Sequence, residues 1–247
     1  MTTTPEPPTQ PRVEVHEDAA ELSTAVAGEL LNRIADAQAA GGVPNICLTG
    51  GTIAESIHRE VARLAPESGV DWGAVEFWFG DERFVDPDSP DRNVRQAKAA
   101  FLDEVGVPAH RIHHMPSPAE VPDVETGAAA YAQELLASSG HFDVMMLGVG
   151  PDGHIASLFP GFPQLDAFDV LAVGVTGSPK PPPLRISLTF RALRSAGAVW
   201  FLVSGEAKAS AVASALSGAD VHQTPAAGVH GKDETIWFLD RAAASQL

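Results

Sequence analysis

The chain has 247 residues, of which 45% are hydrophobic and 19% are charged, a balance typical of a folded globular protein rather than a disordered one. No apolar stretch reaches the roughly 20 residues that a membrane-spanning helix needs, so we expect no membrane partner. The formal net charge of −16 repels polyanions, which argues against nucleic-acid binding.

The N-terminal stretch MTTTPEPPTQPR, residues 1–12, is rich in Pro and Thr and predicts a flexible tail. Residues 13–247 are expected to form one α/β domain. The single cysteine, Cys47, lies in the apolar run VPNICLT, which favours a small core residue over a nucleophile. A lone cysteine forms no internal disulfide, which fits a reducing compartment, so we expect a cytoplasmic protein. The sequence leaves the oligomeric state open between a monomer and a small homo-oligomer.

Helical and strand patterns alternate along the chain. Continuous apolar runs of four to eight residues predict strands, and apolar residues recurring at helical spacing predict helices. The expected elements, in chain order, are helix 18–40, strand 45–49, helix 52–65, strand 75–79, polar loop 80–92, helices 93–105 and 124–139, strands 142–149, 168–175, 184–189 and 198–204, helix 206–218 and strand 235–240.

This alternation predicts an α/β fold. Several strands are apolar on both faces, which indicates a single-domain, Rossmann-like open sheet, mostly parallel, with helices on both faces. Ligands bind such sheets beyond the carboxyl ends of the strands. Three unusual loops each follow a strand, and their polar residues are therefore expected to meet at one rim. They are TGGT (49–52), GDERFVDPDSPDRN (80–93) and GVGPDGH (148–154).

The first loop, in LTGGTIAES, suits an anion. Gly50 and Gly51 allow the backbone to approach a ligand closely, and the helix that follows offers free N–H groups to a phosphate. The loop lacks the Gly-Lys-[Ser/Thr] of a P-loop and the three glycines of a dinucleotide fingerprint. A tight strand-to-helix turn, with Thr52 as a helix N-cap, is the alternative.

The second loop places charged residues directly after an aromatic strand. Asp81 or Glu82 can hold Arg83 in place, so that its planar guanidinium meets a phosphate or a carboxylate. A solvated turn is the alternative. The Asp- and Pro-rich residues behind Arg83 predict an exposed lid, and Asn93 fits an N-cap for the next helix.

The third loop, GVGPDGHIASLFPG, carries the strongest signal. Gly148, Gly150 and Gly153 permit a tight turn that brings His154 to the rim of the sheet. Histidine is the side chain best suited to accept a proton near neutral pH. Asp152, two residues earlier, can orient the imidazole or can form a local Asx-turn.

Two later cations are also candidates. Lys208 lies in the first turn of a predicted helix, where the helix dipole disfavours positive charge unless an anion is bound. Its alternative is a lysine that extends into solvent. Arg185 stands at the mouth of a strand after a proline-rich loop, where a surface ion pair is the alternative to a ligand contact. The segment HRIHH, residues 110–114, has no cysteine or acidic residue adjacent in sequence, so a solvated or structural role is favoured and no metal site is expected.

In combination, the motifs LTGGT, FWFGDERFV…SPDRN and GVGPDGHIASLFPG, in this order, resemble the 6-phosphogluconolactonase family. The resemblance runs from Val13 to the C-terminus and includes the later segments PLRISLT, GEAKA and TPAAGV. It implies hydrolysis of a phosphosugar lactone, 6-phospho-D-glucono-1,5-lactone, to 6-phosphogluconate in the oxidative pentose phosphate pathway. It also implies that the reaction needs no metal and no redox cofactor.

The resemblance further implies roles for single residues. His154 would be the general base that activates water against the lactone carbonyl, and Arg83, positioned by Asp81, would lie near the sugar ring. The residues implied to hold the phosphate are Gly50, Gly51, Thr52, Arg185 and Lys208.

Two alternatives stay open. The glucosamine-6-phosphate deaminase/isomerase group shares the fold and a similar histidine loop, but continues into an acidic segment where this chain has SLFPG. A non-catalytic protein that binds sugar phosphates is expected to have lost the catalytic group, whereas His154 is present.

Overall fold

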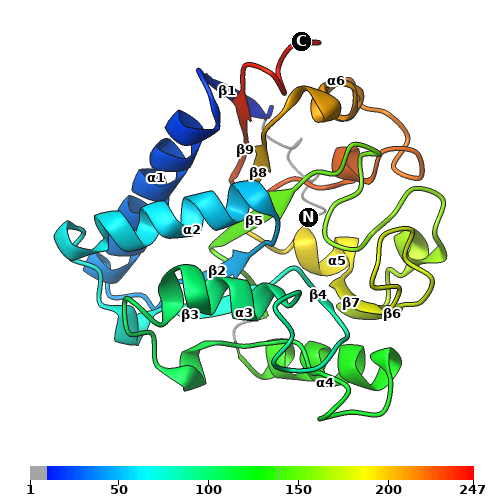
Figure 1. The fold of residues 1–247 in the computed structure, drawn as a ribbon, viewed down its shortest axis with the longest axis horizontal. Coiled ribbons are helices and arrows are strands. Elements are labelled where there is room, and N and C mark those ends of the chain that lie inside the picture. The colour runs from blue at the N-terminus through cyan, green and yellow to red at the C-terminus, as the bar shows by residue number, and fades with distance from the viewer. Residues whose placement is uncertain (1–9, 139) are drawn as a thin grey trace, which may run out of the picture.

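The computed structural model of the chain describes residues 10–138 and 140–247. Its centre is a fully parallel six-stranded sheet with the strand order β1-β9-β8-β5-β2-β3 (Figure 1). The strands are β1 (Arg12–His16), β2 (Asn45–Leu48), β3 (Glu76–Phe79), β5 (Val144–Gly148), β8 (Ala198–Val203) and β9 (Glu234–Asp240).

Helices cover both faces of this sheet, which explains the continuous apolar runs of its strands. Every residue of β2 and β8 is buried, as expected for strands that are enclosed on both sides. One face packs against α1 (Ala19–Ala39), α2 (Thr52–Leu64) and α3 (Asn93–Ala97), which lie side by side in Figure 1. The other face packs against α4 (Val124–Ala137), α5 (Phe190–Leu193) and α6 (Ala209–Leu216).

Successive residues of a strand supply the two cores in turn. Ile46 and Leu48 of β2 pack under α1 and α2, whereas Cys47 between them packs on the opposite face. Cys47 is thus the small core residue that the sequence predicts. The structure confirms the α/β fold with an open, mostly parallel sheet and helices on both faces.

A second, smaller sheet is attached at the carboxyl edge of the first. Its strands, in the order β4-β7-β6, are antiparallel. Gly80 joins the two sheets, because its N–H donates to Leu48 O at 3.0 Å and its carbonyl accepts from Leu188 N at 2.9 Å. The strands are β4 (Asp81–Arg83), β6 (Ala172–Val175) and β7 (Arg185–Leu188).

This second sheet corrects three expectations. The polar loop predicted over 80–92 begins with strand β4, because Asp81–Arg83 pairs with β7. The strands expected over 168–175 and 184–189 belong to the small sheet and not to the parallel one, and the first of them begins only at Ala172. The pairing of β4 with β7 joins segments distant in sequence, so local patterns do not reveal it.

The N-terminal boundary also differs. Of the tail predicted over residues 1–12, residues 1–9 lie outside the described part of the chain, and Arg12 already begins β1, opposite Ile236. The sequence gives little sign of β1, because an edge strand with exposed Val13 and Val15 lacks a buried apolar run. Within the described residues, no helix is long and apolar enough to cross a membrane.

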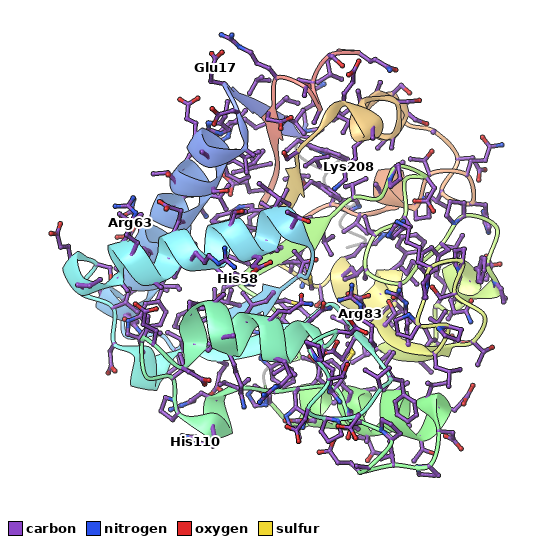
Figure 2. The ribbon with its side chains drawn as sticks, viewed as in Figure 1. Glu17, His58, Arg63, Arg83, His110 and Lys208 are labelled. Atoms are coloured by element: carbon purple, nitrogen blue, oxygen red, sulfur yellow. The ribbon has the colours of Figure 1, made fainter. Side chains whose placement is uncertain are left out.

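One buried histidine makes the fold sensitive to acid. His58 of α2 is 3% exposed and packs against Phe101, with ring centroids 4.9 Å apart. Figure 2 shows it between α2 and α3. Its Nε2 has no hydrogen-bond partner among the described residues. Burial lowers the pKa of His58 from its ordinary value of 6.5 to about 4, because the charged imidazolium is poorly solvated there.

We predict that His58 makes the protein less stable as the pH falls. Its pKa is lower in the folded state, so the unfolded chain binds more protons between pH 4 and pH 6.5. The stabilisation is therefore complete above pH 6.5 and is lost as the pH falls toward 4. Between pH 7.5 and pH 5, the free energy of unfolding of the wild type should fall by about 2 kcal/mol more than that of His58→Leu.

Urea unfolding followed by tryptophan fluorescence measures this difference. The control is His110→Leu, at an exposed histidine that Figure 2 shows on the outside of the molecule. As the pH falls, the free energy of unfolding of this control should decrease in parallel with that of the wild type. Parallel curves for the wild type and His58→Leu would contradict the prediction.

Candidate active site

The loops that follow the parallel strands line a cleft of about 510 Å³. It lies where the strand order reverses, since β3 continues the sheet on one side of β2, and β5, β8 and β9 continue it on the other. In Figure 2, Arg83 and Lys208 lie on two sides of the N-terminal end of α2. The polar and turn residues of the lining include Gly50, Gly51, Thr52, Asp81, Arg83, Asn93, Gly150, His154, Lys180, Arg185, Ser204 and Lys208.

The glycine turn after β2 leaves the start of α2 open. Gly51 has a φ of +101° and is the N-cap of α2, where no side chain accepts from the first N–H groups. Thr52 is therefore the first helical residue and not the N-cap that the sequence suggests. Gly50 is required for a different reason, because a Cβ at this position would overlap the side-chain oxygen of Asn93.

The loop after β5 folds back tightly around His154. Gly150 N donates to His154 O at 2.9 Å, and Gly153 N donates to Gly150 O at 2.9 Å. A Cβ on Gly150 would overlap the imidazole ring, and Gly153 has a φ of +80°. These contacts explain why the loop carries glycines around its histidine.

Asp152 orients the imidazole of His154. Its Oδ1 contacts His154 Nδ1 and also accepts from the His154 backbone N–H at 3.5 Å, so the orienting contact and the local turn occur together. Burial raises the pKa of Asp152, but the hydrogen bond and charge of His154, with the charge of Lys180, lower it to about 2. An ionised Asp152 keeps the proton on Nδ1, which leaves the Nε2 lone pair free to accept a proton.

Asn93 lies between Asp81 and Arg83. Asp81 Oδ2 accepts from Ser157 Oγ at 2.6 Å, and its Oδ1 accepts from Asn93 Nδ2 at 3.2 Å. Arg83 Nη1 donates to the side-chain oxygen of Asn93, and no ion pair joins Arg83 to Asp81. The expectation that Asp81 positions Arg83 directly is thus corrected, because the Asp81 carboxylate is occupied by Ser157 and Asn93.

Glu82 holds the corner between β4 and α3. Its carboxylate accepts from the backbone N–H groups of Arg83, Asn93 and Val94 at 2.9, 2.7 and 3.0 Å. Burial raises the pKa of Glu82, although these hydrogen bonds and the charge of Arg92 oppose the shift. Asn93 is consequently the first residue of α3, not its N-cap, which is Arg92. Glu82 fixes the backbone from which Arg83 and Asn93 project.

Arg185 is 5% exposed, so the surface ion pair considered from the sequence is wrong. Its Nε and Nη2 donate to three carbonyls of the proline-rich loop, and its Nη1 lies 3.9 Å from Asp81 Oδ2. Lys208 also lines the cleft, and the pKa of Lys208 is lowered by burial and by the charge of Lys180. Sequence reasoning missed Lys180, whose one signal is a lone cation in SPKPPP.

In the HRIHH segment, His113 has a structural role, whereas His110 and His114 are exposed, so both roles favoured from the sequence occur. The ring of His113 stacks on Trp78 with centroids 3.7 Å apart. Its two nitrogens contact Glu134 at 2.6 Å and Glu76 at 2.9 Å. This histidine therefore ties β3 to α4.

Comparisons with known proteins agree with this geometry. Residues 17–237 match the family model described as glucosamine-6-phosphate isomerases/6-phosphogluconolactonase. The chain is 47% identical to a 6-phosphogluconolactonase of Streptomyces coelicolor, over 96% of this chain and 95% of that protein. It is 41% identical to a 6-phosphogluconolactonase of Mycobacterium tuberculosis, over 95% and 98% of the two chains.

A solved structure of 6-phosphogluconolactonase from Thermotoga maritima matches with a TM-score of 0.82 at 26% identity. The match covers 93% of this chain and 99% of the other. Fold, motifs and full-length relatives therefore agree, and the chain belongs to the family of glucosamine-6-phosphate isomerases and 6-phosphogluconolactonases.

Proposed function

We propose that this protein hydrolyses 6-phospho-D-glucono-1,5-lactone to 6-phospho-D-gluconate, a reaction of the oxidative pentose phosphate pathway. The observation that carries the proposal is the presence, in one cleft, of the Asp152–His154 pair, the open start of α2 and several cations. Relatives of 41% and 47% identity over nearly the whole chain are 6-phosphogluconolactonases, which supports the same reaction.

The phosphate is assigned to the end of the cleft at the start of α2. The backbone N–H groups that follow Gly51 have no side-chain cap, and the helix dipole favours an anion there. Arg185 and Lys208 line the same cleft and add positive charge. In a protein of net charge −16, such a local excess of cations favours a dianionic ligand. Gly50, Gly51, Thr52 and Lys208 are the proposed phosphate contacts, and Arg185 lines the same cleft.

His154 is the proposed general base. Its Nε2 takes a proton from water as the oxygen attacks C1 of the lactone, while Asp152 stabilises the imidazolium that forms. The bond between C1 and the ring oxygen then breaks, and the proton passes from His154 to that oxygen. A lactone is an activated ester, so a positioned base and an electrostatic partner suffice without a covalent enzyme intermediate.

Arg83 is the proposed partner of the carbonyl oxygen. Asn93 holds its guanidinium in the cleft, and among the described residues no carboxylate forms an ion pair with it. An arginine without a carboxylate partner can stabilise the negative charge that develops on the carbonyl oxygen in the transition state. Asp81 contributes indirectly, through its hydrogen bonds with Asn93.

The first prediction from this function concerns His154. The purified protein should accelerate lactone hydrolysis over the uncatalysed reaction, and His154→Gln should lower kcat by about 10²–10⁴-fold, the usual contribution of a positioned general base. A continuous assay that couples 6-phosphogluconate to a dehydrogenase measures both rates after subtraction of the background.

The control variant is His110→Gln, at an exposed histidine outside the cleft, which should keep the wild-type rate. Ammonia release from glucosamine 6-phosphate, with no lactonase activity, would assign the protein to deamination instead. Full lactonase activity in His154→Gln would leave the reaction standing but remove His154 from it.

The second prediction concerns Asp152. The pKa of Asp152, about 2, keeps its carboxylate ionised throughout pH 5–8, so the carboxylate is available to His154 over this whole range. Asp152→Asn should therefore lower kcat at every pH from 5 to 8, because a neutral amide does not stabilise the imidazolium that forms during the reaction as a carboxylate does. Steady-state rates measured across this range test the effect. A variant with the wild-type kcat would argue against an orienting role for Asp152.

A further inference from the structure

Lys180 is a cation of the cleft that the proposed site does not include. It lies in the loop between β6 and β7, is half-buried, and lines the cleft together with Lys208. Among the described residues, no carboxylate forms an ion pair with either lysine. The chain has only four lysines and a net charge of −16, so two lysines that line one cleft without an ion pair indicate a negatively charged ligand. Carboxylates act on both lysines from a longer distance, Asp152 on Lys180 and Asp240 on Lys208.

The backbone of Lys180 is held in place by Arg185. Arg185 Nη2 donates to the carbonyls of Lys180 and Pro181 at 3.1 and 3.2 Å, and its Nε donates to Pro182 O at 3.3 Å. Ser178 Oγ also donates to Lys180 O, at 2.9 Å. Loops that connect strands are usually mobile, whereas the loop between β6 and β7 is held by hydrogen bonds from the buried guanidinium of Arg185.

The charge of Lys180 acts on groups at two positions in the cleft. Together with burial, it lowers the pKa of Lys208, and it contributes to the lowered pKa of Asp152. The charge of Asp240 offsets part of the repulsion between the two ammonium groups at Lys208. A phosphate dianion between them would turn this repulsion into two attractive contacts.

We propose that Lys180 and Lys208 together clamp the phosphate of the substrate, and that Arg185 is a positioning residue that holds Lys180 in this clamp. The proposal rests on the proposed function, in which a sugar phosphomonoester occupies the cleft. The proposal changes the role of Arg185 from a phosphate ligand, as the family resemblance implies, to a positioning residue. Two of its three guanidinium nitrogens already donate to carbonyls of the loop. Lys180 would then determine the preference for a phosphorylated lactone.

Lys180→Met tests the clamp. The preference for 6-phosphogluconolactone over glucono-1,5-lactone, as the ratio of the two kcat/KM values, should fall roughly 10- to 100-fold, the effect of losing one charge-assisted contact. The loss should appear mainly in KM, and Lys180→Arg should restore most of it. The control Lys232→Met removes the same charge from an exposed lysine at the opposite edge of the sheet. An unchanged preference in Lys180→Met would overturn the proposal.

Arg185→Met separates positioning from direct contact. If Arg185 acts through Lys180, the double variant Lys180→Met/Arg185→Met should lose no more preference than the worse single variant. If Arg185 contacts the phosphate itself, the two losses should multiply, and its assigned role would be wrong. Circular dichroism establishes that each variant is folded.

Binding of inorganic phosphate and of 6-phosphogluconate, measured by calorimetry, distinguishes the clamp from the reaction. Weaker binding of both in Lys180→Met, in a protein that does not hydrolyse the lactone, would keep the clamp and refute the proposed function. Hydrolysis by the wild type with equal phosphate binding in Lys180→Met would keep the function and refute the clamp.

Discussion

The site depends on the reversal of strand order between β2 and β5. Parallel strands send all their carboxyl ends to one edge, and where the chain turns outward in opposite directions the loops diverge and leave a crevice. The glycine turn leaves β2 on one side of this crevice, and the His154 loop leaves β5 on the other. A helix start and an imidazole, about 100 residues apart in sequence, therefore face one ligand.

A network of buried polar groups then fixes the third side of the cleft, which carries Arg83. Burial of an unpaired polar side chain is costly, and three polar side chains are buried here, those of Asp81, Glu82 and Asn93. Each of them forms hydrogen bonds with neighbouring groups, which offsets this cost. Asn93 also packs so closely on Gly50 that no larger residue fits there. The glycine turn after β2 and the segment that carries Arg83 and Asn93 are thus packed against each other.

Electrostatics explain how a strongly acidic protein can hold the anionic sugar that we propose as its substrate. Its long-range field is negative, so the attraction must be local and desolvated. Arg83, Arg185, Lys180 and Lys208 all line one cleft, and Arg83 lies opposite Arg185 in the β4–β7 pair. Asp152 adds a carboxylate beside this cationic group, where it serves the imidazole.

The sequence by itself determined the fold class, the three loops at one rim and the candidates His154, Arg83, Arg185 and Lys208, because strand and helix periodicity and glycine chemistry are local properties. Only the tertiary structure decided which side chains of the cleft contact one another. It placed Asn93 between Asp81 and Arg83, turned Arg185 toward the proline loop and brought Lys180 to the cleft. The contacts of Asn93 and the pairing of β4 with β7 join separate segments of the chain, and packing rather than local pattern selects them. The Arg185 contacts are local in sequence, but the direction of its side chain is set by burial at the cleft.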